Sequence, residues 1–340
     1  MKKVLCVVLA LFLVLAMVAG CGGGAASPEP GNGNGNGEGP ENGDMPELKV
    51  ALMLPGTIND GSWNATAYQG LMLIEEELGA TVSFAEMVPQ SDNEEIMRGF
   101  AEAGFDIIFG HSFAYHETAT MMADQYPDVK FVINSTRLSY GDNVAGVETS
   151  TEESGFLAGA LAALNSESGK IFSLGGLEIP TVMIQFDWFE RGAKMINPDI
   201  VVESTFIGSG DDAGAARELT AAFIDQGYDM GIVNANQASL GAYEAIRDQD
   251  TTKLVGVVAN INEALPEHVV GSVAFSYPQA MLFVAERIVA GTFEATAYNV
   301  GVDDGGVIFH PNAGVIDPEH ERIINDLIDD IIAGRITFED

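Results

Sequence analysis

The residues best suited to chemistry in this chain are amides and aromatic rings rather than charged groups. The segment from Asn59 to Asn64 brings Asp60, Trp63 and Asn64 close together. A tryptophan can stack on a flat ring, and polar groups beside it can donate and accept hydrogen bonds. This combination predicts recognition of a planar, uncharged molecule, with Asp60, Trp63 and Asn64 as candidate contacts. The alternative for Trp63 is an apolar side chain that fixes the start of a helix.

Further amides and aromatic rings follow later apolar segments of the chain. Phe113 and Tyr115 could form a second aromatic wall of the same site. Amide side chains stand at Asn134, Asn234 and Asn236. A ligand pocket with a few well-placed polar groups needs residues of this kind. For Asn234 and Asn236, a turn in which the amide bonds its own backbone is an equal alternative.

Residues for metal binding or covalent chemistry are sparse. His111 and His116 are close in sequence, but no third ligand stands at a recognisable spacing, so we expect no metal site. The acidic pairs at 211–212 and 303–304 are more typical of helix caps and turns than of calcium sites. The strings Gly-x-Ser-x-Gly, His-Glu-x-x-His and Gly-Lys-Ser/Thr do not occur. We therefore expect neither an enzyme nor a cofactor.

The elements that must position these side chains alternate between apolar strands and helices. Short apolar runs predict buried strands at 49–54, 81–88, 106–111, 130–134, 143–148, 170–174, 200–207, 229–234 and 253–258. Apolar residues recur at helical spacing over 63–78 and again over about 317–333. This alternation predicts an α/β protein with parallel sheets and helices on both faces.

Local signals predict several helix ends. Ser91 and Glu94 form a capping-box pair ahead of an apolar stripe. An aspartate at 211–212 can cap a helix over 213–226, which Gly227 can end. Both helices would connect consecutive strands.

The pattern of strands and helices occurs twice along the chain. Three landmarks recur at offsets of 121, 123 and 123 residues: Lys49 with Lys170, Gly104 with Gly227, and Lys130 with Lys253. The repeat predicts two lobes, each a doubly wound, mainly parallel sheet that binds ligand beyond the carboxyl ends of its strands. We expect the first lobe to comprise 47–147 plus about 274–296, and the second 148–273 plus about 297–340.

The passage between the lobes lacks the composition of a linker, which indicates a hinge rather than a tether. We expect hinge strands near 143–149 and 269–277, about which the lobes open and close. Two independent α/β domains without a shared site are the alternative.

The first 46 residues differ in composition from the rest. Two lysines at 2–3 precede an apolar run and then small residues before Cys21, which is typical of a cleaved signal. Residues 15–21 resemble a bacterial lipobox, which implies a lipoprotein signal peptide over 1–20 and a lipid on Cys21; an ordinary secretory signal is the alternative. Residues 21–46 are rich in Gly, Asn and Pro and predict a disordered tether. We expect an extracytoplasmic protein that is lipid-anchored to a bacterial cell membrane.

Charge and length bear on the class of partner and on domain number. Fifty acidic residues against fifteen basic ones give a formal net charge of −35, with no basic cluster after the leader. A nucleic-acid partner requires clustered Lys and Arg, so we expect no nucleic-acid binding. The 340 residues, 47% of them hydrophobic, are enough for two domains, each with its own core.

Several motifs stand in a fixed order along the chain. They are Ile58–Gly70, Pro127–Phe131, Thr151–Gly159, Gly175–Pro180 with Phe189, Gly192 and Asn197–Asp199 after it, and Asp303–Val307. Together they resemble the basic membrane protein family, also called the PnrA-like family, over about residues 48–335. The resemblance implies a type I periplasmic-binding-protein fold and a solute-binding lipoprotein of an ABC importer. Its partners would be permease and ATPase subunits and a small-molecule ligand, and we expect a monomer.

The resemblance also implies the ligand, a purine nucleoside or, in some branches, a free purine base, held in an interlobe cleft. The base would stack on Trp63, where the family commonly has Phe, with Asn64 as a polar contact beside it. Val258 stands where an Asp is common, and Asn260 where a further Asp is frequent. An amide binds ribose hydroxyls without the charge assistance of a carboxylate. Ser112–Tyr115 also looks closer to the branch that holds a bare base.

Two other functions stay open at the level of sequence. A lipoprotein that senses another planar small molecule would share both the fold and the site. A secreted nucleoside-acting hydrolase would need a nucleophile with a base, or an Asp cluster that grips a metal. Neighbouring genes for an ATPase and permeases would favour import, and nucleoside turnover by the pure protein would favour the enzyme.

Overall fold

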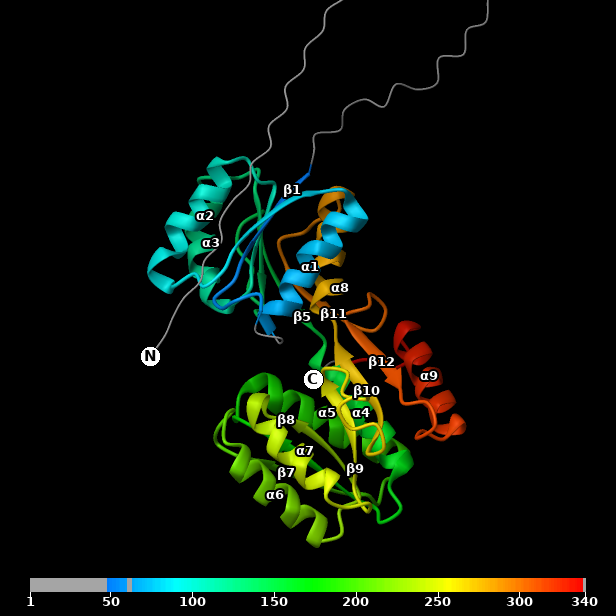
Figure 1. Ribbon diagram of the computed structural model, residues 1–340. Helices are drawn as coiled ribbons and strands as arrows, with labels where there is room; N and C mark the ends of the chain where they lie inside the picture. The colour runs from blue at the N-terminus through cyan, green and yellow to red at the C-terminus, as the bar shows by residue number, and fades with distance from the viewer. Residues whose placement is uncertain (1–47, 60–62, 339–340) are drawn as a thin grey trace, which may run out of the picture. The chain divides into compact units, whose positions relative to one another are not determined.

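Sheets of mainly parallel strands, covered by helices on both faces, form the framework of the chain (Figure 1). The computed structural model describes residues 48–59 and 63–338. In those residues the first sheet has the order β11-β5-β4-β3-β1-β2. Its strands are β1 (Lys49–Met53), β2 (Thr81–Ala85), β3 (Ile107–Gly110), β4 (Lys130–Asn134), β5 (Val144–Thr149) and β11 (Ala297–Val300), and all pair in parallel.

The second sheet repeats this topology, with the order β12-β10-β9-β8-β6-β7. Its strands are β6 (Lys170–Gly175), β7 (Val201–Phe206), β8 (Met230–Asn234), β9 (Lys253–Val258), β10 (Val269–Phe275) and β12 (Val307–Pro311). The edge strand β12 runs antiparallel to β10, and the other pairs are parallel. The shared order explains why landmarks recur at a nearly constant offset in the sequence.

Helices connect the strands and pack on the sheets. They are α1 (Trp63–Leu78), α2 (Asn93–Glu102), α3 (His116–Ala123), α4 (Thr151–Asn165), α5 (Pro180–Ile196), α6 (Ala213–Asp225), α7 (Ser239–Arg247), α8 (Tyr277–Val289) and α9 (Pro318–Ile332). Short 3₁₀ turns occur at η1 (Gln90–Asp92), η2 (Phe113–Tyr115) and η3 (Asn236–Ala238).

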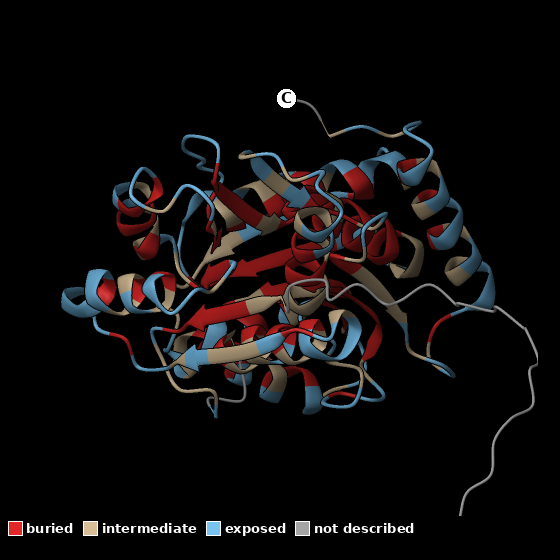
Figure 2. Cartoon of the chain, turned by 90° about the horizontal axis from the view of Figure 1, so that it is seen from above, coloured by how far each residue is buried: buried red, intermediate tan, exposed pale blue. Residues whose placement is uncertain are grey.

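Each sheet buries two apolar layers because successive side chains of a strand point to opposite faces. In β1, Val50 and Leu52 pack with α1 and α8, whereas Ala51 and Met53 pack with α2 and α3. In the second sheet, α4, α5 and α9 cover one face, and α6 and α7 cover the other. Figure 2 shows the result: the strands are largely buried, and the exposed residues lie on the outer sides of the helices.

The chain passes between the two sheets at three places. It leaves the first sheet between β5 and α4, returns between β10 and α8, and leaves again between β11 and β12. The sequence predicted the first two of these passages, near 143–149 and 269–277. The third was missed because β11 is short and carries no strong apolar run.

Glycines allow α4 and α5 to cross at very close range. A β-carbon on Gly155 would lie 2.3 Å from the carbonyl oxygen of Gln185, and one on Gly159 would lie 1.9 Å from that of Phe189. From the opposite helix, a β-carbon on Gly192 would lie 2.0 Å from the carbonyl oxygen of Phe156. These glycines belong to the motifs on which the family resemblance rests, and their reason is steric.

The predicted α/β architecture with two doubly wound sheets is confirmed. The cap of α6 by Asp212 and the left-handed Gly227 after that helix also agree with the sequence. The Ser91–Glu94 capping box was wrong, because Ser91 donates to the carboxylate of Asp92 instead and the chain enters α2 through the turn η1.

The lobe boundaries also need one correction. β11 pairs with β5 in the first sheet, although the expected second lobe began at about 297. The physical reason is that residue 297 begins a strand that completes the edge of the first sheet before the third passage. Within the described residues, no helix has both the length and the apolar character needed to cross a bilayer.

Candidate functional site

The candidate residues lie in loops that follow the carboxyl ends of parallel strands. In both sheets the strand order reverses at one strand, which is β1 in the first sheet and β6 in the second. Doubly wound sheets bind ligands beyond the carboxyl ends at such points. The loop from β1 to α1, which contains Trp63 at its end, is therefore the first place to look.

Hydrogen bonds to its backbone hold this first loop. The Gly56 N–H donates to Oδ1 of Asn64 over 3.2 Å, and the Ile58 N–H donates to Oε2 of Glu86 over 2.9 Å. Asn64 is buried, and a β-carbon on Gly56 would lie 2.5 Å from its Nδ2. The structure thus gives Asn64 a role in shaping the loop, in addition to its predicted role as a contact. Asp60 lies outside the described residues.

Trp63 stacks on His111, which follows β3. The two ring centroids are 4.0 Å apart with a tilt of 35°. His111 Nε2 lies 3.0 Å from the carbonyl oxygen of Trp63, and its Nδ1 lies 2.8 Å from Nδ2 of Asn134. Because an amide nitrogen can only donate, Nδ1 must accept, which places the imidazole proton on Nε2. His111 therefore orients Trp63 and is itself oriented by the fully buried Asn134.

A further ring joins this group from the second passage between the sheets. Tyr277, the first residue of α8, approaches His111 edge-on with 5.5 Å between ring centroids. Burial raises the pKa of Tyr277, so its hydroxyl stays protonated, while hydrogen bonds with Ser135, Trp63 and Thr149 act in the opposite direction. Tyr277 therefore connects the Trp63 cluster to one of the passages. Sequence reasoning missed it, since a Tyr at a helix start carries no distinctive signal.

The two aromatic residues predicted after β3 have different environments. Phe113 is 71% exposed and remains suited to a contact with ligand. Tyr115 is buried against α2 and α3, and its hydroxyl has no hydrogen-bond partner in the part of the chain that the structure describes. The turn η2 thus leaves Phe113 exposed and buries Tyr115, so Tyr115 does not form part of an exposed aromatic wall.

In the second sheet, Asn234 at the end of β8 is held by a chain of buried polar groups. Its Nδ2 donates to Oε1 of Gln185 over 2.8 Å, and Gln185 Nε2 donates to Oγ of Ser154 over 3.2 Å. Ser154 Oγ in turn donates to the carbonyl oxygen of Val273 over 3.1 Å. This chain, and not a local turn, orients Asn234. Gln185 could have been noticed as a polar residue on the apolar face of α5.

Asn236 and Asn260 are exposed in the loops after β8 and β9. Asn236 starts η3, and the Asn260 side chain accepts a hydrogen bond from the N–H of Asn262 over 3.1 Å. Both can turn a polar group to a ligand, but among residues 48–59 and 63–338 no contact couples them to Trp63. Their role in binding stays a prediction.

Strained backbone marks the same ends of the strands. In the described residues, the positive φ angles of non-glycine residues occur at Met87, Ser135, Asn236 and Val258, with values of 54°, 63°, 47° and 69°. These residues follow or end β2, β4, β8 and β9. A left-handed conformation is costly for Val258 in particular, because its β-carbon is branched. Strain of this kind gathers at functional sites in folded proteins.

Apolar side chains are also exposed along these loops. They include Phe113, Leu138, Leu177 and Val258, and exposed Leu240 lies in the first turn of α7. Together with the amides, they favour an uncharged ligand that has flat apolar faces.

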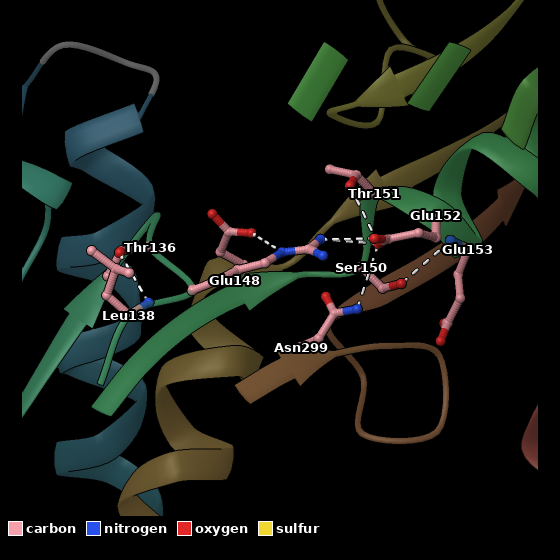
Figure 3. Close-up of polar contacts among 9 residues, drawn as sticks. Thr136, Leu138, Glu148, Ser150, Thr151, Glu152, Glu153 and Asn299 are labelled. Atoms are coloured by element: carbon pink, nitrogen blue, oxygen red, sulfur yellow. Dashed lines mark hydrogen bonds and ion pairs between the residues drawn. The ribbon is translucent and has the colours of Figure 1, made fainter. Parts of the chain in front are cut away.

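Ionic groups gather at the first passage between the sheets instead (Figure 3). Arg137, after β4, pairs with Glu148 of β5 over 2.8 Å and with Glu152 of α4 over 2.9 Å. Asn299 of β11 donates to Glu152 over 3.5 Å. Hydrogen bonds and the positive charge of Arg137 lower the pKa of Glu152 and outweigh its burial. This cluster joins both lobes through short contacts beside the chain passages.

The neighbouring Glu153 links the first passage to the third. Its Oε2 accepts the N–H of Val302 over 2.7 Å, and a β-carbon on Gly301 would lie 2.3 Å from its Oε1. Burial raises the pKa of Glu153 to about 7, and the acidic groups of Asp303, Glu152 and Asp304 add to this rise. Glu153 is therefore a half-buried carboxyl group with a raised pKa at a junction of the lobes.

Among the described residues, no group of three or more His, Cys, Asp or Glu side chains is placed to hold a metal ion. The Asp212 side chain caps α6, as expected for the first acidic pair. Cys21 lies outside the described residues.

Comparison with known proteins places the whole described chain in one family. The family model described as ABC transporter substrate-binding protein PnrA-like matches residues 47–339. Basic membrane protein A of Borreliella burgdorferi is 29% identical over 294 residues, which cover 85% of this chain and 86% of that protein. A purine-binding protein of Brucella abortus is 27% identical over 268 residues, with 78% and 75% coverage.

Other similar proteins are named as transcriptional activators rather than as binding proteins. The transcriptional activator protein Med of Bacillus subtilis is 27% identical over 281 residues, which cover 82% of this chain and 87% of Med. The crystal structure of a transcriptional activator of the comK gene from Bacillus halodurans superposes with a TM-score of 0.76 at 24% identity, covering 86% of this chain and all of that one. At this identity the superposition shows the shared fold alone.

Proposed function

Because the chain belongs to the PnrA-like family of ABC transporter substrate-binding proteins, we propose that it binds a purine nucleoside or a purine base between its two lobes. The family is a class of solute-binding proteins of ABC transporters, which act outside the cytoplasm together with permease and ATPase subunits, and it is not a class of enzymes. The ligand, the lipid anchor and the monomeric state are parts of the proposal.

The observation that carries the proposal is the place of Trp63. Its ring stands at the start of α1, beyond the carboxyl end of the strand at which the order of the first sheet reverses. His111 supports the ring over 4.0 Å. Stacking of a base on such a ring contributes about 1–3 kcal/mol. The name of the purine-binding relative from Brucella abortus supports a purine as the stacked molecule.

The polar groups around the candidate site favour a neutral ligand. Asn234 and Asn260 supply amides, and Val258 stands at the end of β9, where a carboxylate would suit ribose. A site without that carboxylate binds a sugar more weakly. We therefore rank a free base above its nucleoside, and another planar heterocycle after both.

We also propose that Cys21 carries a lipid and that the segment from 21 to 46 tethers the lobes to the outer side of the cell membrane. The support is the lipobox-like order of residues before Cys21 and the Gly- and Asn-rich composition after it. A tethered binding protein stays close to its permease, which raises the rate of delivery.

A thermal-shift screen tests the ligand directly. The chain from Pro46 onward forms one compact unit and can be tested in that form. We expect purine bases and nucleosides to raise its melting temperature, because a ligand at 100 times its Kd stabilises the folded state by about 2.7 kcal/mol. Sugars and amino acids serve as controls. A rise with a sugar or an amino acid and none with any purine would contradict the proposal.

A second candidate function is ligand sensing. The similarity to Med, which is named a transcriptional activator, favours it. A sensor would use the same fold and the same ligand site, so ligand binding does not separate the two functions. Uptake of radiolabelled purine does: deletion of the gene should abolish uptake for an importer component and leave it unchanged for a sensor.

A further inference from the structure

A small cavity in the first lobe lies beside the loops that carry the candidate ligand contacts. It has a volume of about 100 Å³ and is lined by three loops, with Pro55 after β1, Asn93 after β2, and Ser112 and Tyr115 after β3. Since β1 lies between β2 and β3, the carboxyl ends of three neighbouring strands meet there. This is the place at which a doubly wound sheet receives ligand.

The walls of the cavity are held by backbone hydrogen bonds. The Val88 N–H donates to the carbonyl oxygen of Leu54 over 3.0 Å, and the Met87 N–H donates to that of Gly56 over 3.1 Å. Gly110 leaves room for the tyrosine, because a β-carbon there would lie 2.9 Å from Cβ of Tyr115. The cavity is thus bordered by loops that backbone hydrogen bonds hold in place.

Two buried polar groups line the cavity without a protein partner. Asn93 is 3% exposed and Tyr115 is 1% exposed. Oδ1 of Asn93 and the hydroxyl of Tyr115 have no hydrogen-bond partner among residues 48–59 and 63–338. Buried polar groups are nearly always paired in folded proteins, so two orphans at one cavity require an explanation.

The chemistry of the lining restricts what can enter. None of the lining residues is charged. Burial raises the pKa of Tyr115 to about 12, so the phenol keeps its proton at neutral pH and can donate. Oδ1 of Asn93 can only accept. A matching group therefore offers a donor to Asn93 and an acceptor to Tyr115, and carries no charge.

We propose that this cavity, which we call the Asn93–Tyr115 pocket, receives the polar edge of the ligand's ring. The edge donates to Oδ1 of Asn93 and accepts from the Tyr115 hydroxyl. Its volume equals that of about three water molecules in the liquid, which suits an exocyclic group and the ring nitrogen beside it rather than a sugar. A neutral heterocycle with a lactam N–H and C=O, or with an amino group beside a ring nitrogen, has such an edge.

The assignment rests on the proposed function and specifies its ligand class. The loop after β3 connects the two parts, because His111 supports Trp63 and Ser112 and Tyr115 line the pocket. A ring stacked on Trp63 could thus place one edge in the pocket. The pocket would select purines by their substituents, since a buried polar group left unpaired by the wrong ligand penalises its binding.

Calorimetric titration of wild type and two variants tests the pocket. Tyr115→Phe removes only the hydroxyl, and Asn93→Leu removes the amide at similar volume. Tyr140→Phe, at an exposed tyrosine away from the pocket, is the matched control. The ligands are hypoxanthine and adenine, which have the donor–acceptor edge, and unsubstituted purine, whose six-membered ring has neither an N–H nor an exocyclic group.

We expect wild type to prefer hypoxanthine or adenine over purine by at least tenfold. Each pocket variant should lose at least tenfold affinity for the preferred base, keep its affinity for purine, and melt no lower than wild type without ligand. Tyr140→Phe should behave like wild type. If one pocket variant fails to fold, the other variant still tests the pocket.

The possible failures are distinguishable. Wild type that binds no purine at all refutes the proposed function together with this assignment. If wild type binds purines and both variants keep its preferences, the assignment of the pocket alone is overturned. The cavity is then a site for water. An equal loss for all three ligands also overturns it, because the residues would then support the fold rather than read a substituent.

Discussion

His111 shows how one residue can join the parts of the candidate site. One ring nitrogen donates to the backbone of Trp63, the other accepts from Asn134, and the ring face supports the indole. The sequence suggested His111 only as a possible metal ligand. Its observed neighbours are a ring and an amide, which fix its tautomer and leave it as a positioning residue for Trp63.

At this scale we predict that Trp63→Ala lowers purine affinity at least tenfold, because the stacking surface is lost. Trp63→Phe keeps a flat ring and should retain most of the affinity. The chain has two tryptophans, Trp63 and Trp188, so ligand should quench fluorescence in wild type and not in Trp63→Phe. Affinity is measured by calorimetry, and an unchanged value in Trp63→Ala would remove this residue from the site.

At the scale of elements, helix α4 connects packing to the passages between the sheets. Its first turn carries Glu152 and Glu153, which contact Asn299 and Val302 at the third passage, and its next turns carry Gly155 and Gly159 against α5. The same helix therefore fixes the core of the second lobe and one side of the hinge. A substitution in the first turn should therefore change how stability depends on pH. A substitution in the next turns should change the stability itself.

Gly159→Ala should destabilise the protein, because the added β-carbon would lie 1.9 Å from the carbonyl oxygen of Phe189 and force the helices apart. Overpacking of this kind costs about 1–3 kcal/mol. Gly99→Ala in α2 is the matched control: nothing lies within 4 Å of its added β-carbon, and alanine favours helix by up to about 1 kcal/mol. Urea denaturation measures both, and equal stability of the two variants would refute the close crossing.

Glu153 should make stability depend on pH. Its folded pKa of about 7 lies above the ordinary value of 4.5, so the folded state binds more protons between these values. The contribution of Glu153 to the free energy of unfolding is therefore largest at low pH and falls as pH rises from about 4.5 to 7. Glu153→Gln keeps an acceptor for the Val302 N–H and removes the titration.

The difference between wild type and Glu153→Gln isolates this effect from Glu152, whose lowered pKa acts in the opposite direction. We expect urea denaturation to show the variant gaining about 1–3 kcal/mol relative to wild type between pH 5 and pH 7.5. A constant difference across that range would show that Glu153 does not titrate there.

At the scale of the whole molecule, the chain divides into residues Met1–Met45 and one compact unit from Pro46 to Asp340. The compact unit contains both sheets and all of the contacts described above. Ligand binding should therefore not require the first 45 residues, whereas location in the cell should depend on them. The two properties can be separated by mutation.

Cys21→Ala tests the proposed anchor, since a lipid requires the thiol. We predict that the variant leaves the membrane fraction and appears in the soluble extracytoplasmic fraction, with purine affinity unchanged. Fractionation followed by immunoblotting measures the first property, and calorimetry the second. A variant that stays in the membrane fraction would show that another feature holds the protein there.

The class of fold, the double repeat and the family could all be predicted from the amino-acid sequence. Buried strands and amphipathic helices follow from local spacing of apolar residues, and 63–78 is a helix with the predicted bounds. Trp63, Phe113 and Asn234 could be named because each follows a recognisable strand. These features depend on neighbours in the chain, and a linear pattern records them.

Tertiary structure alone decided how those residues are held. Tyr277 meets His111, and Gln185 meets Asn234, only after folding brings distant parts of the chain together. Val302 meets Glu153 in the same way. The burial of Tyr115 and the rise in the pKa of Glu153 depend likewise on packing from several elements. No local spacing encodes such contacts, because their energy comes from groups that only the folded core brings together.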